Sequence, residues 1–248
     1  MKQVILITGS GRGIGAATAL LAGRRGYAVC INYRSDAAAA EALRRRIVAA
    51  GGEAIAVQAD VGVEADVLRL FATVDAQLGG ITALVNNVGI LETQCRLTEM
   101  SAERLQRVFT TNVISYFLCC KEAVRRMSTA SGGQGGAIVN VSSGAAKVGS
   151  PNVYIDYAAS KGAVDTLTLG LSKEVAAEGI RVNCVRPGLI YTEIHASGGD
   201  ADRVARMADS VPMRRGGQPE EVAEAILWLL SPAASYVSGS FIDAAGAR

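Results

Sequence analysis

Short apolar runs alternate with longer segments of mixed polarity along almost the whole chain. The first run, Val4–Ile7, leads directly into a glycine-rich turn. Comparable runs lie at residues 28–33, 54–58, 83–85, 137–141, 180–185 and 241–242. Short runs of this kind are typical of strands that are buried on both faces of a parallel sheet.

The segments between these runs predict helices. They cover residues 18–25 (the continuation of a helix that starts in the glycine turn), 36–50, 64–77, 101–127, 156–178 and 220–230. Ser35 or Asp36 is expected to cap the second helix, and glycines end the first two. Strands that alternate with helices form a parallel sheet covered on both faces, and right-handed crossovers wind it in both directions. We therefore expect an α/β fold, a Rossmann-like, doubly wound parallel sheet of about seven strands, in a single domain over residues 1–248.

Composition argues against several classes of function. The 248 residues carry a net charge of only +2 without a long basic run, so neither nucleic acid nor an anionic membrane is expected as a partner. No apolar run reaches the roughly 20 residues that cross a bilayer, and the N-terminus enters a strand at once, unlike a signal peptide. The five cysteines lack metal-ligand spacing. We expect buried free thiols, no metal site and a cytoplasmic setting.

A glycine-rich segment, Thr8–Gly15, follows the first strand and opens the first helix. Its glycines let the backbone approach a pyrophosphate, and the helix N-terminus offers free N–H groups and a positive dipole end. A tight turn without a ligand is the alternative, but the position between strand and helix favours a dinucleotide. The expected contacts are Gly9, Arg12, Gly13, Ile14 and Gly15.

The glycine spacing, T-G-x-x-x-G-x-G, resembles that of the short-chain dehydrogenase/reductase family. Further motifs of that family follow in the same order: Asp60-Val61, Asn86-Asn87-Val88-Gly89 and Pro187-Gly188, each directly after a predicted strand. The resemblance covers essentially the whole chain. It implies that Asp60, Val61, Asn87, Gly89, Pro187 and Gly188 bind the cofactor. Val88 replaces the usual alanine, from which we expect only a slight local shift.

The residues after the second strand favour NADP over NAD as the cofactor. A carboxylate at this place would hold the ribose 2′-hydroxyl of NAD, but no acid occurs before Asp36. Arg34 and Ser35 can instead hold a 2′-phosphate, with Arg12 as a second basic contact. The alternative is that both arginines are solvated loop residues.

Tyr157 and Lys161 are the candidate catalytic pair, because their spacing places a phenol and an ammonium on one helix face. A nearby ammonium lowers a tyrosine pKa, so the phenol could exchange a proton near neutral pH. The resemblance implies that both also contact the cofactor, that Ser143 holds the substrate oxygen and that Asn112 supports a proton relay through water. Ser142 is expected to point away. The separation of Ser143 from Tyr157 is about one residue longer than usual in the family, which indicates an insertion.

The segment after Pro187-Gly188 is expected to form a substrate lid over residues 189–218. It is polar, small and rich in glycine from Glu193 to Gln218. By resemblance, Ile190 lies at the nicotinamide ring and Thr192 holds its carboxamide. His195, the only histidine, is interpreted as a surface or lid residue. Tyr154, with no lysine four residues later, is expected to line the substrate pocket.

The predicted function is hydride transfer between NADP(H) and a carbonyl or secondary alcohol. A 3-oxoacyl-carrier-protein reductase and a sugar dehydrogenase remain open as subtypes, as does a dinucleotide-binding protein without turnover. Arg125 and Arg126 could meet an acidic carrier or form a solvated face. The resemblance also implies a homotetramer that pairs the helices around residues 105–127 and 157–177 across one interface and residues 238–241 across another.

Overall fold

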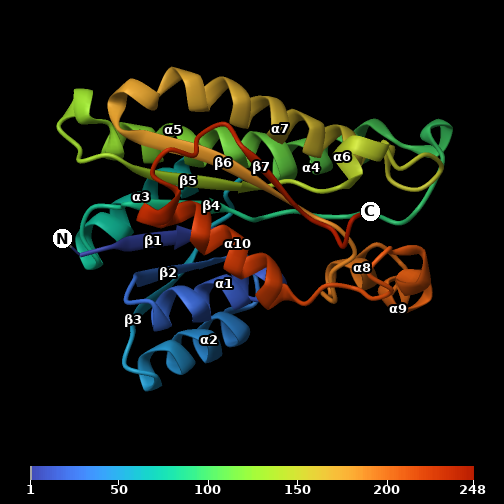
Figure 1. Ribbon diagram of the computed structural model, residues 1–248, viewed down its shortest axis with the longest axis horizontal. Coiled ribbons are helices and arrows are strands. Elements are labelled where there is room, and N and C mark those ends of the chain that lie inside the picture. Colours follow the sequence, from blue (N-terminus) through green and yellow to red (C-terminus); the bar gives the residue numbers. More distant parts are fainter. Residues whose placement is uncertain (1) are drawn as a thin grey trace.

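The computed structural model describes residues 2–248, which form a seven-stranded sheet flanked by helices (Figure 1). All strands are parallel, in the order β3-β2-β1-β4-β5-β6-β7. Their bounds are β1 Val4–Ile7, β2 Ala28–Tyr33, β3 Glu53–Gln58, β4 Ala83–Asn86, β5 Gly136–Val141, β6 Ile180–Pro187 and β7 Phe241–Ala244. The predicted doubly wound parallel sheet is confirmed. The strand order reverses between β1 and β4, where such sheets leave a crevice for ligands.

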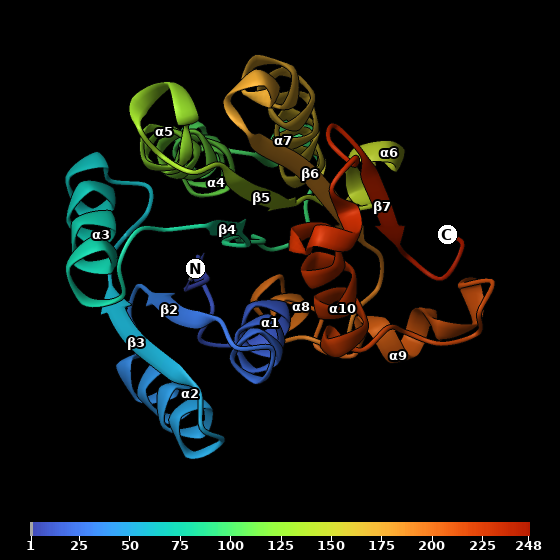
Figure 2. The ribbon, with the colours of Figure 1, turned by 60° about the vertical axis from the view of Figure 1, so that its left-hand side comes forward.

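Helices cover both faces of the sheet (Figure 2). One face carries α1 (Gly13–Arg24), α2 (Ala37–Ala49) and α10 (Pro219–Leu230). The other carries α3 (Glu64–Gln77), α4 (Ala102–Phe109), α5 (Ser115–Met127) and α7 (Ile155–Glu174). Short helices α6 (Ala145–Val148), α8 (Ile194–Ser197) and α9 (Arg203–Met207) lie near the carboxyl ends of the strands.

The continuous apolar runs are explained by burial on both faces. In β1, Ile5 and Ile7 join the core under α1 and α10, whereas Val4 and Leu6 join the core under α3 and α5. Successive side chains of a strand point to opposite faces of the sheet. In a strand that is covered on both faces, every side chain is therefore buried, which favours apolar residues at all positions.

Several predicted boundaries differ from the structure. The predicted helix 101–127 is divided by a π-helical turn, Thr110–Ile114, between α4 and α5. The predicted helix 156–178 ends at Glu174, and a 3₁₀ turn, Ala176–Glu178, follows. Asp36 caps α2 as expected, because its carboxylate accepts a hydrogen bond from the backbone N–H of Ala39 (2.9 Å).

The five cysteines are free thiols, four of them buried and Cys95 half-buried. Over residues 2–248, no helix combines the length and the apolar character that crossing a membrane requires. The same residues contain no cluster of side chains with metal-ligating geometry.

Candidate active site

A cavity of about 640 Å³ opens at the carboxyl ends of the strands, beside the reversal of strand order. It is lined by the loops that follow β1, β2, β3, β4, β5 and β6, and by the first turns of α7. All the residues predicted for cofactor binding and catalysis line this cavity, except Gly15 and Asn112. Both lie directly behind residues that do.

The glycine loop has the geometry that a pyrophosphate requires. Gly13, the first residue of α1, has a φ of +55°, which favours glycine. A Cβ on Gly15 would lie 2.6 Å from Asn87 Nδ2, so any side chain there would collide with the loop after β4. At Gly11, no atom of the described chain lies within 4 Å of the position of a Cβ, so the backbone faces open space. The first turn of α1 contains no acidic residue. These features fit a dinucleotide.

Hydrogen bonds lock the loop after β4 against the glycine loop. The Thr8 hydroxyl accepts hydrogen bonds from the backbone N–H groups of Asn87 (3.0 Å) and Val88 (3.2 Å). The Asn87 amide donates in return to the carbonyls of Thr8 and Gly9 (3.0 and 3.1 Å). Val88 packs directly against Gly9. Two walls of the cofactor cleft are thereby held at a fixed separation.

Arg34 lies at the far end of the cleft, free for a ligand. Its side chain is 65% exposed, and Nη1 stands 3.9 Å from Asp60 Oδ2, an exposed pair that contributes little to stability. The nearby Asp36 carboxylate is engaged in capping α2. Arg12 and Ser35 also line the cavity. The arrangement suits an anionic group at this end.

Lys161 and Tyr157 lie together on α7, but the lysine is directed elsewhere. Its buried Nζ donates to the Tyr116 hydroxyl (3.1 Å) and to the Val141 carbonyl (2.9 Å). Burial lowers the pKa of Lys161 to about 8. Burial also raises the pKa of Tyr157, and the Ser143 hydroxyl only partly opposes this. The expected lowering of the tyrosine pKa by the ammonium is therefore wrong for this structure.

The two serines after β5 have different partners. Ser142 is buried and its hydroxyl donates to the Lys161 carbonyl (3.1 Å), which ties β5 to α7. Within residues 2–248, the hydrogen bond that Ser143 Oγ accepts is local, from the N–H of Ala145 (3.1 Å), and Ser143 lines the cavity beside Tyr157, whose pKa its hydroxyl lowers in part. Its hydroxyl proton is thus available to a substrate oxygen.

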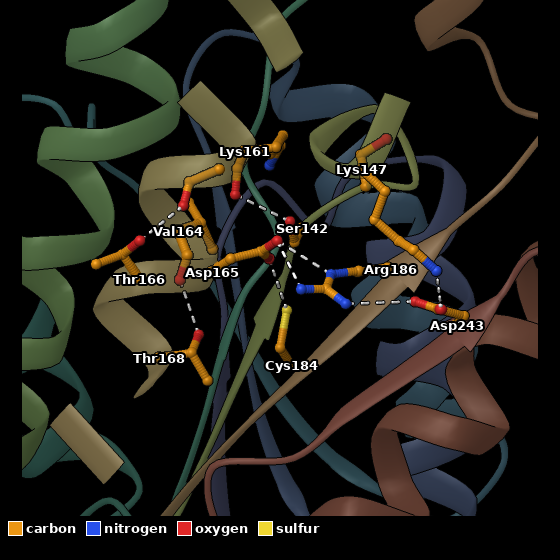
Figure 3. Close-up of polar contacts among 12 residues, drawn as sticks. Ser142, Lys147, Lys161, Val164, Asp165, Thr166, Thr168, Cys184, Arg186 and Asp243 are labelled. Atoms are coloured by element: carbon orange, nitrogen blue, oxygen red, sulfur yellow. Dashed lines mark hydrogen bonds and ion pairs between the residues drawn. The ribbon is translucent and has the colours of Figure 1, made fainter. Parts of the chain in front are cut away.

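An ion-pair network joins α7 to β6, β7 and α6 (Figure 3). Asp165, one turn after Lys161, accepts hydrogen bonds from Arg186 of β6 (2.8 and 3.0 Å). Arg186 also approaches Asp243 of β7 (3.7 Å), which pairs with Lys147 of α6 (2.8 Å). The chain of charges links four elements around the base of the site.

Asn112 is fully buried in the π-helical turn, and its side chain is occupied. Oδ1 accepts from the N–H of Ile90 (2.8 Å), and Nδ2 donates to the Ile90 carbonyl (3.1 Å) and to Ser160 Oγ (3.2 Å). The side chain therefore positions the loop after β4. The π-helical turn breaks the regular backbone pattern at this point.

Tyr116 is a site residue that sequence reasoning missed. Its hydroxyl, fully buried, lies within hydrogen-bond distance of the carbonyls of Val88 (3.0 Å) and Val141 (2.9 Å) and accepts from Lys161. In the sequence it is one tyrosine within a helix, 45 residues before Lys161. Its spacing of four residues from Asn112 is the one available signal, and it is too common to be specific.

His195 is interpreted from the sequence as a surface or lid residue, and of these two the surface position is wrong. It lies in α8, inside the expected lid, but is only 9% exposed and lines the cavity. Its Nε2 lies 3.1 Å from the Ile190 carbonyl, because α8 folds back against that strand end. Burial lowers its pKa, so the imidazole is neutral at pH 7. Tyr154 is buried and lines the cavity, as expected.

Comparison with known proteins gives matches over the whole length. Residues 9–246 match a family model described as enoyl-(acyl carrier protein) reductase. An uncharacterized oxidoreductase of Escherichia coli is 59% identical over 245 residues, which are 99% of each chain. A 3-ketoacyl-(acyl-carrier-protein) reductase of Brucella melitensis, solved with NADH, is 33% identical with a TM-score of 0.91 over 99% of this chain and 98% of that one. A mutant short-chain dehydrogenase/reductase of Serratia marcescens is 31% identical, with a TM-score of 0.89 over 99% and 97%.

Proposed function

The chain belongs to the short-chain dehydrogenase/reductase family, and on that premise we propose that it interconverts a carbonyl and a secondary alcohol with NADP(H) as the preferred cofactor. It is an oxidoreductase that acts on CH–OH groups of small molecules with a nicotinamide dinucleotide. The observation that carries the proposal is that Ser143, Tyr157 and Lys161 converge on the cavity that the glycine loop also lines.

Each catalytic role follows from a side chain's position. The nicotinamide, when bound, supplies the hydride for reduction. Tyr157 donates its phenolic proton to the carbonyl oxygen, and the Ser143 hydroxyl donates a hydrogen bond to the same oxygen. Lys161 remains positively charged beside them, bonded to Tyr116 and Val141, and would hold the nicotinamide ribose when the cofactor is bound. Asn112 holds the loop at Ile90 and thereby the wall that faces the ring.

The surroundings of the site support further proposals. Residues 189–218 form the substrate lid, because their short helices α8 and α9 border the cavity on one side. Ile190 and Thr192 line the cavity from this lid and would contact the nicotinamide when the cofactor is bound. A homotetramer is proposed on the family resemblance, and the five free thiols favour a reducing, cytoplasmic setting.

Two enzyme subtypes are candidates, a 3-oxoacyl-carrier-protein reductase and a sugar dehydrogenase. The Brucella neighbour is named for the first of these reactions. Arg125 and Arg126, considered as contacts for an acidic carrier, instead pair with Glu122, and Arg126 also with Asp75. Neither arginine is among the residues of the described chain, 2–248, that line the cavity. The solvated-face alternative for these two arginines is therefore favoured.

The function is tested by following NADPH oxidation with a panel of carbonyl compounds. The panel contains a 3-oxoacyl thioester, a diketone and an aldose lactone. We expect turnover with at least one class. Bound NADPH without turnover of any class would argue for a narrower substrate range or against catalysis.

We expect Arg34→Ala to weaken NADPH binding by about ten-fold or more and NADH binding hardly at all. The variant removes a charge-assisted hydrogen bond to the 2′-phosphate, a group that NADH lacks. Fluorescence titration of both cofactors gives the comparison. Arg45→Ala, an exposed arginine of α2 that does not line the cavity, is the matched control. Equal losses for both cofactors would refute the phosphate assignment.

We expect Tyr116→Phe to lower kcat about ten-fold and to move the alkaline limb of the pH profile to lower pH. The hydroxyl accepts a hydrogen bond from the charged form of Lys161, so its removal lowers the lysine pKa from about 8. The profile of kcat/KM between pH 6 and 10 measures the shift. Tyr27→Phe, a buried tyrosine remote from the cavity, is the control. An unshifted profile would exclude a role of Tyr116 in placing Lys161.

A further inference from the structure

Arg203 of α9 is one of the cationic residues that line the cavity, besides Arg12, Arg34, Lys161 and Arg248. Its side chain is only 17% exposed. The guanidinium carbon lies 5.3 Å from the ring centre of Tyr154, which immediately precedes α7 and stands one turn before Tyr157. Arg203 is therefore on the substrate side of the site, away from the adenine end where Arg34 lies.

The hydrogen-bonding capacity of Arg203 is largely unused. Within residues 2–248 its guanidinium makes one hydrogen bond, from Nη1 to Asp200 Oδ2 at the long distance of 3.5 Å. The same oxygen accepts a hydrogen bond from Gln94 (3.1 Å) and a closer one from Arg206. Because Arg206 is the nearer cation, it compensates the Asp200 carboxylate. The side chains of Arg203, Arg206 and Asp200 together carry a net charge of +1. Within residues 2–248, most of the five N–H donors of Arg203 have no acceptor.

Within residues 2–248, the acidic side chains that line the cavity are Asp36, Asp60 and Glu193, and the C-terminal residue Arg248 also lines it. Asp36 and Asp60 lie at the adenine end, beside Arg34. Leu91, Val148, Leu189 and Ile194 form an apolar lining. His195 is neutral, and its Nδ1 finds no hydrogen-bond partner among residues 2–248. The acidic residue nearest in sequence within the lining, Glu193, extends toward the glycine loop, where Oε2 lies 3.7 Å from the position of a Cβ on Gly13. A guanidinium in an apolar wall attracts an anion more strongly than one in water.

We propose that the substrate is an oxo acid, or the corresponding hydroxy acid, whose carboxylate is bound by Arg203 while its carbonyl lies at Ser143 and Tyr157. The planar guanidinium matches a carboxylate with two parallel hydrogen bonds. The carboxylate is a recognition group and is unchanged by the reaction. This inference rests on the proposed function, because it assigns the reacting end of the substrate to Tyr157, and it names a substrate class other than the two subtypes considered from the sequence.

The test measures binding, which does not depend on turnover. Hexanoate and hexanamide, equal in shape but different in charge, are titrated calorimetrically into protein saturated with NADP⁺. We expect hexanoate to bind at least about ten-fold more tightly. Arg203→Met should abolish the difference, Arg203→Lys should retain part of it, and Asp200→Asn should enlarge it by removing the competing carboxylate. Arg214→Met, in the same segment but outside the cavity lining, should leave it unchanged.

Two results would overturn the inference: equal binding of the two probes to the wild type, or a preference for hexanoate that survives in Arg203→Met. Both results concern binding alone, so they can be obtained whether or not the protein reduces carbonyls. A second arm compares kcat/KM for 5-oxohexanoate and its methyl ester. Reduction of the ester alone would retain the proposed function and reject the acid. A preference for hexanoate together with no reduction of any carbonyl would retain the anion site and reject the proposed function.

Discussion

Replacing Tyr157 with phenylalanine should lower kcat by about 10²–10⁴-fold while leaving dinucleotide binding nearly unchanged. The ring and its packing remain, and the variant loses only the phenolic hydroxyl, with the proton that it donates, beside Ser143 and Lys161. Since the pKa of Tyr157 is raised by burial, the phenol is protonated at neutral pH and ready to act as the acid in carbonyl reduction. Single-turnover oxidation of NADPH measures the chemical step, and fluorescence titration measures binding.

Tyr191→Phe provides the matched control for this prediction. Tyr191 is an exposed residue of the lid segment that does not line the cavity, so removal of its hydroxyl should leave kcat within about two-fold. Unchanged turnover in Tyr157→Phe would reject the proposed proton donor. Loss of NADPH binding in that variant would instead assign the tyrosine to the cofactor site alone.

The largest effect on stability is expected at Asp156, the residue before Tyr157. Its carboxylate forms a two-point ion pair with Arg104 of α4 (2.7 and 3.2 Å), and the two side chains are 1% and 10% exposed. Arg104 also donates to the Thr93 carbonyl (2.6 Å), so the pair joins α4, α7 and the loop after β4. Asp156→Asn should lower the free energy of unfolding by about 3–5 kcal/mol, because it leaves the guanidinium buried without a counter-charge.

Urea denaturation of Asp156→Asn and of Glu92→Gln tests this explanation. Glu92 pairs with Arg107 on the surface, so its neutralisation should cost at most about 1 kcal/mol. The double variant Arg104→Met/Asp156→Leu removes both charges and should recover much of the loss. Equal, small effects of Asp156→Asn and Glu92→Gln would mean that the buried pair is not a stabilising element.

The order of the elements was predictable from the sequence because its signals are local. An apolar run such as Val4–Ile7 predicts a strand that is buried on both faces of the sheet. Asp36 marks the start of a helix, because its carboxylate caps the first turn. The glycine loop is partly local as well. Gly13 has a positive φ, and a Cβ on Gly15 would collide with Ser10 of the same loop as well as with Asn87 after β4. The motifs after successive strands had to meet, because the carboxyl ends of parallel strands share one edge of the sheet.

Irregular local structure was predicted less well. The π-helical turn at Asn112 interrupts the predicted helix 101–127. The helices α8 and α9 consist of small and polar residues with little periodicity, so the lid was expected only as a loop. His195 is buried because α8 folds onto Ile190, a contact that no spacing rule indicates.

The sequence alone thus determined the fold, the family and the residues that gather at the cavity, since each depends on a short pattern. The tertiary structure decided which polar atoms meet. The spacing of Tyr157 and Lys161 predicts proximity, yet the ammonium is directed by acceptors from Tyr116 and Val141, which lie 45 and 20 residues away along the chain. The charge left on Arg203 likewise depends on how Asp200 is shared with Arg206 and Gln94. Such partners are chosen by packing, because a buried polar group bonds to whichever acceptor the fold brings within reach.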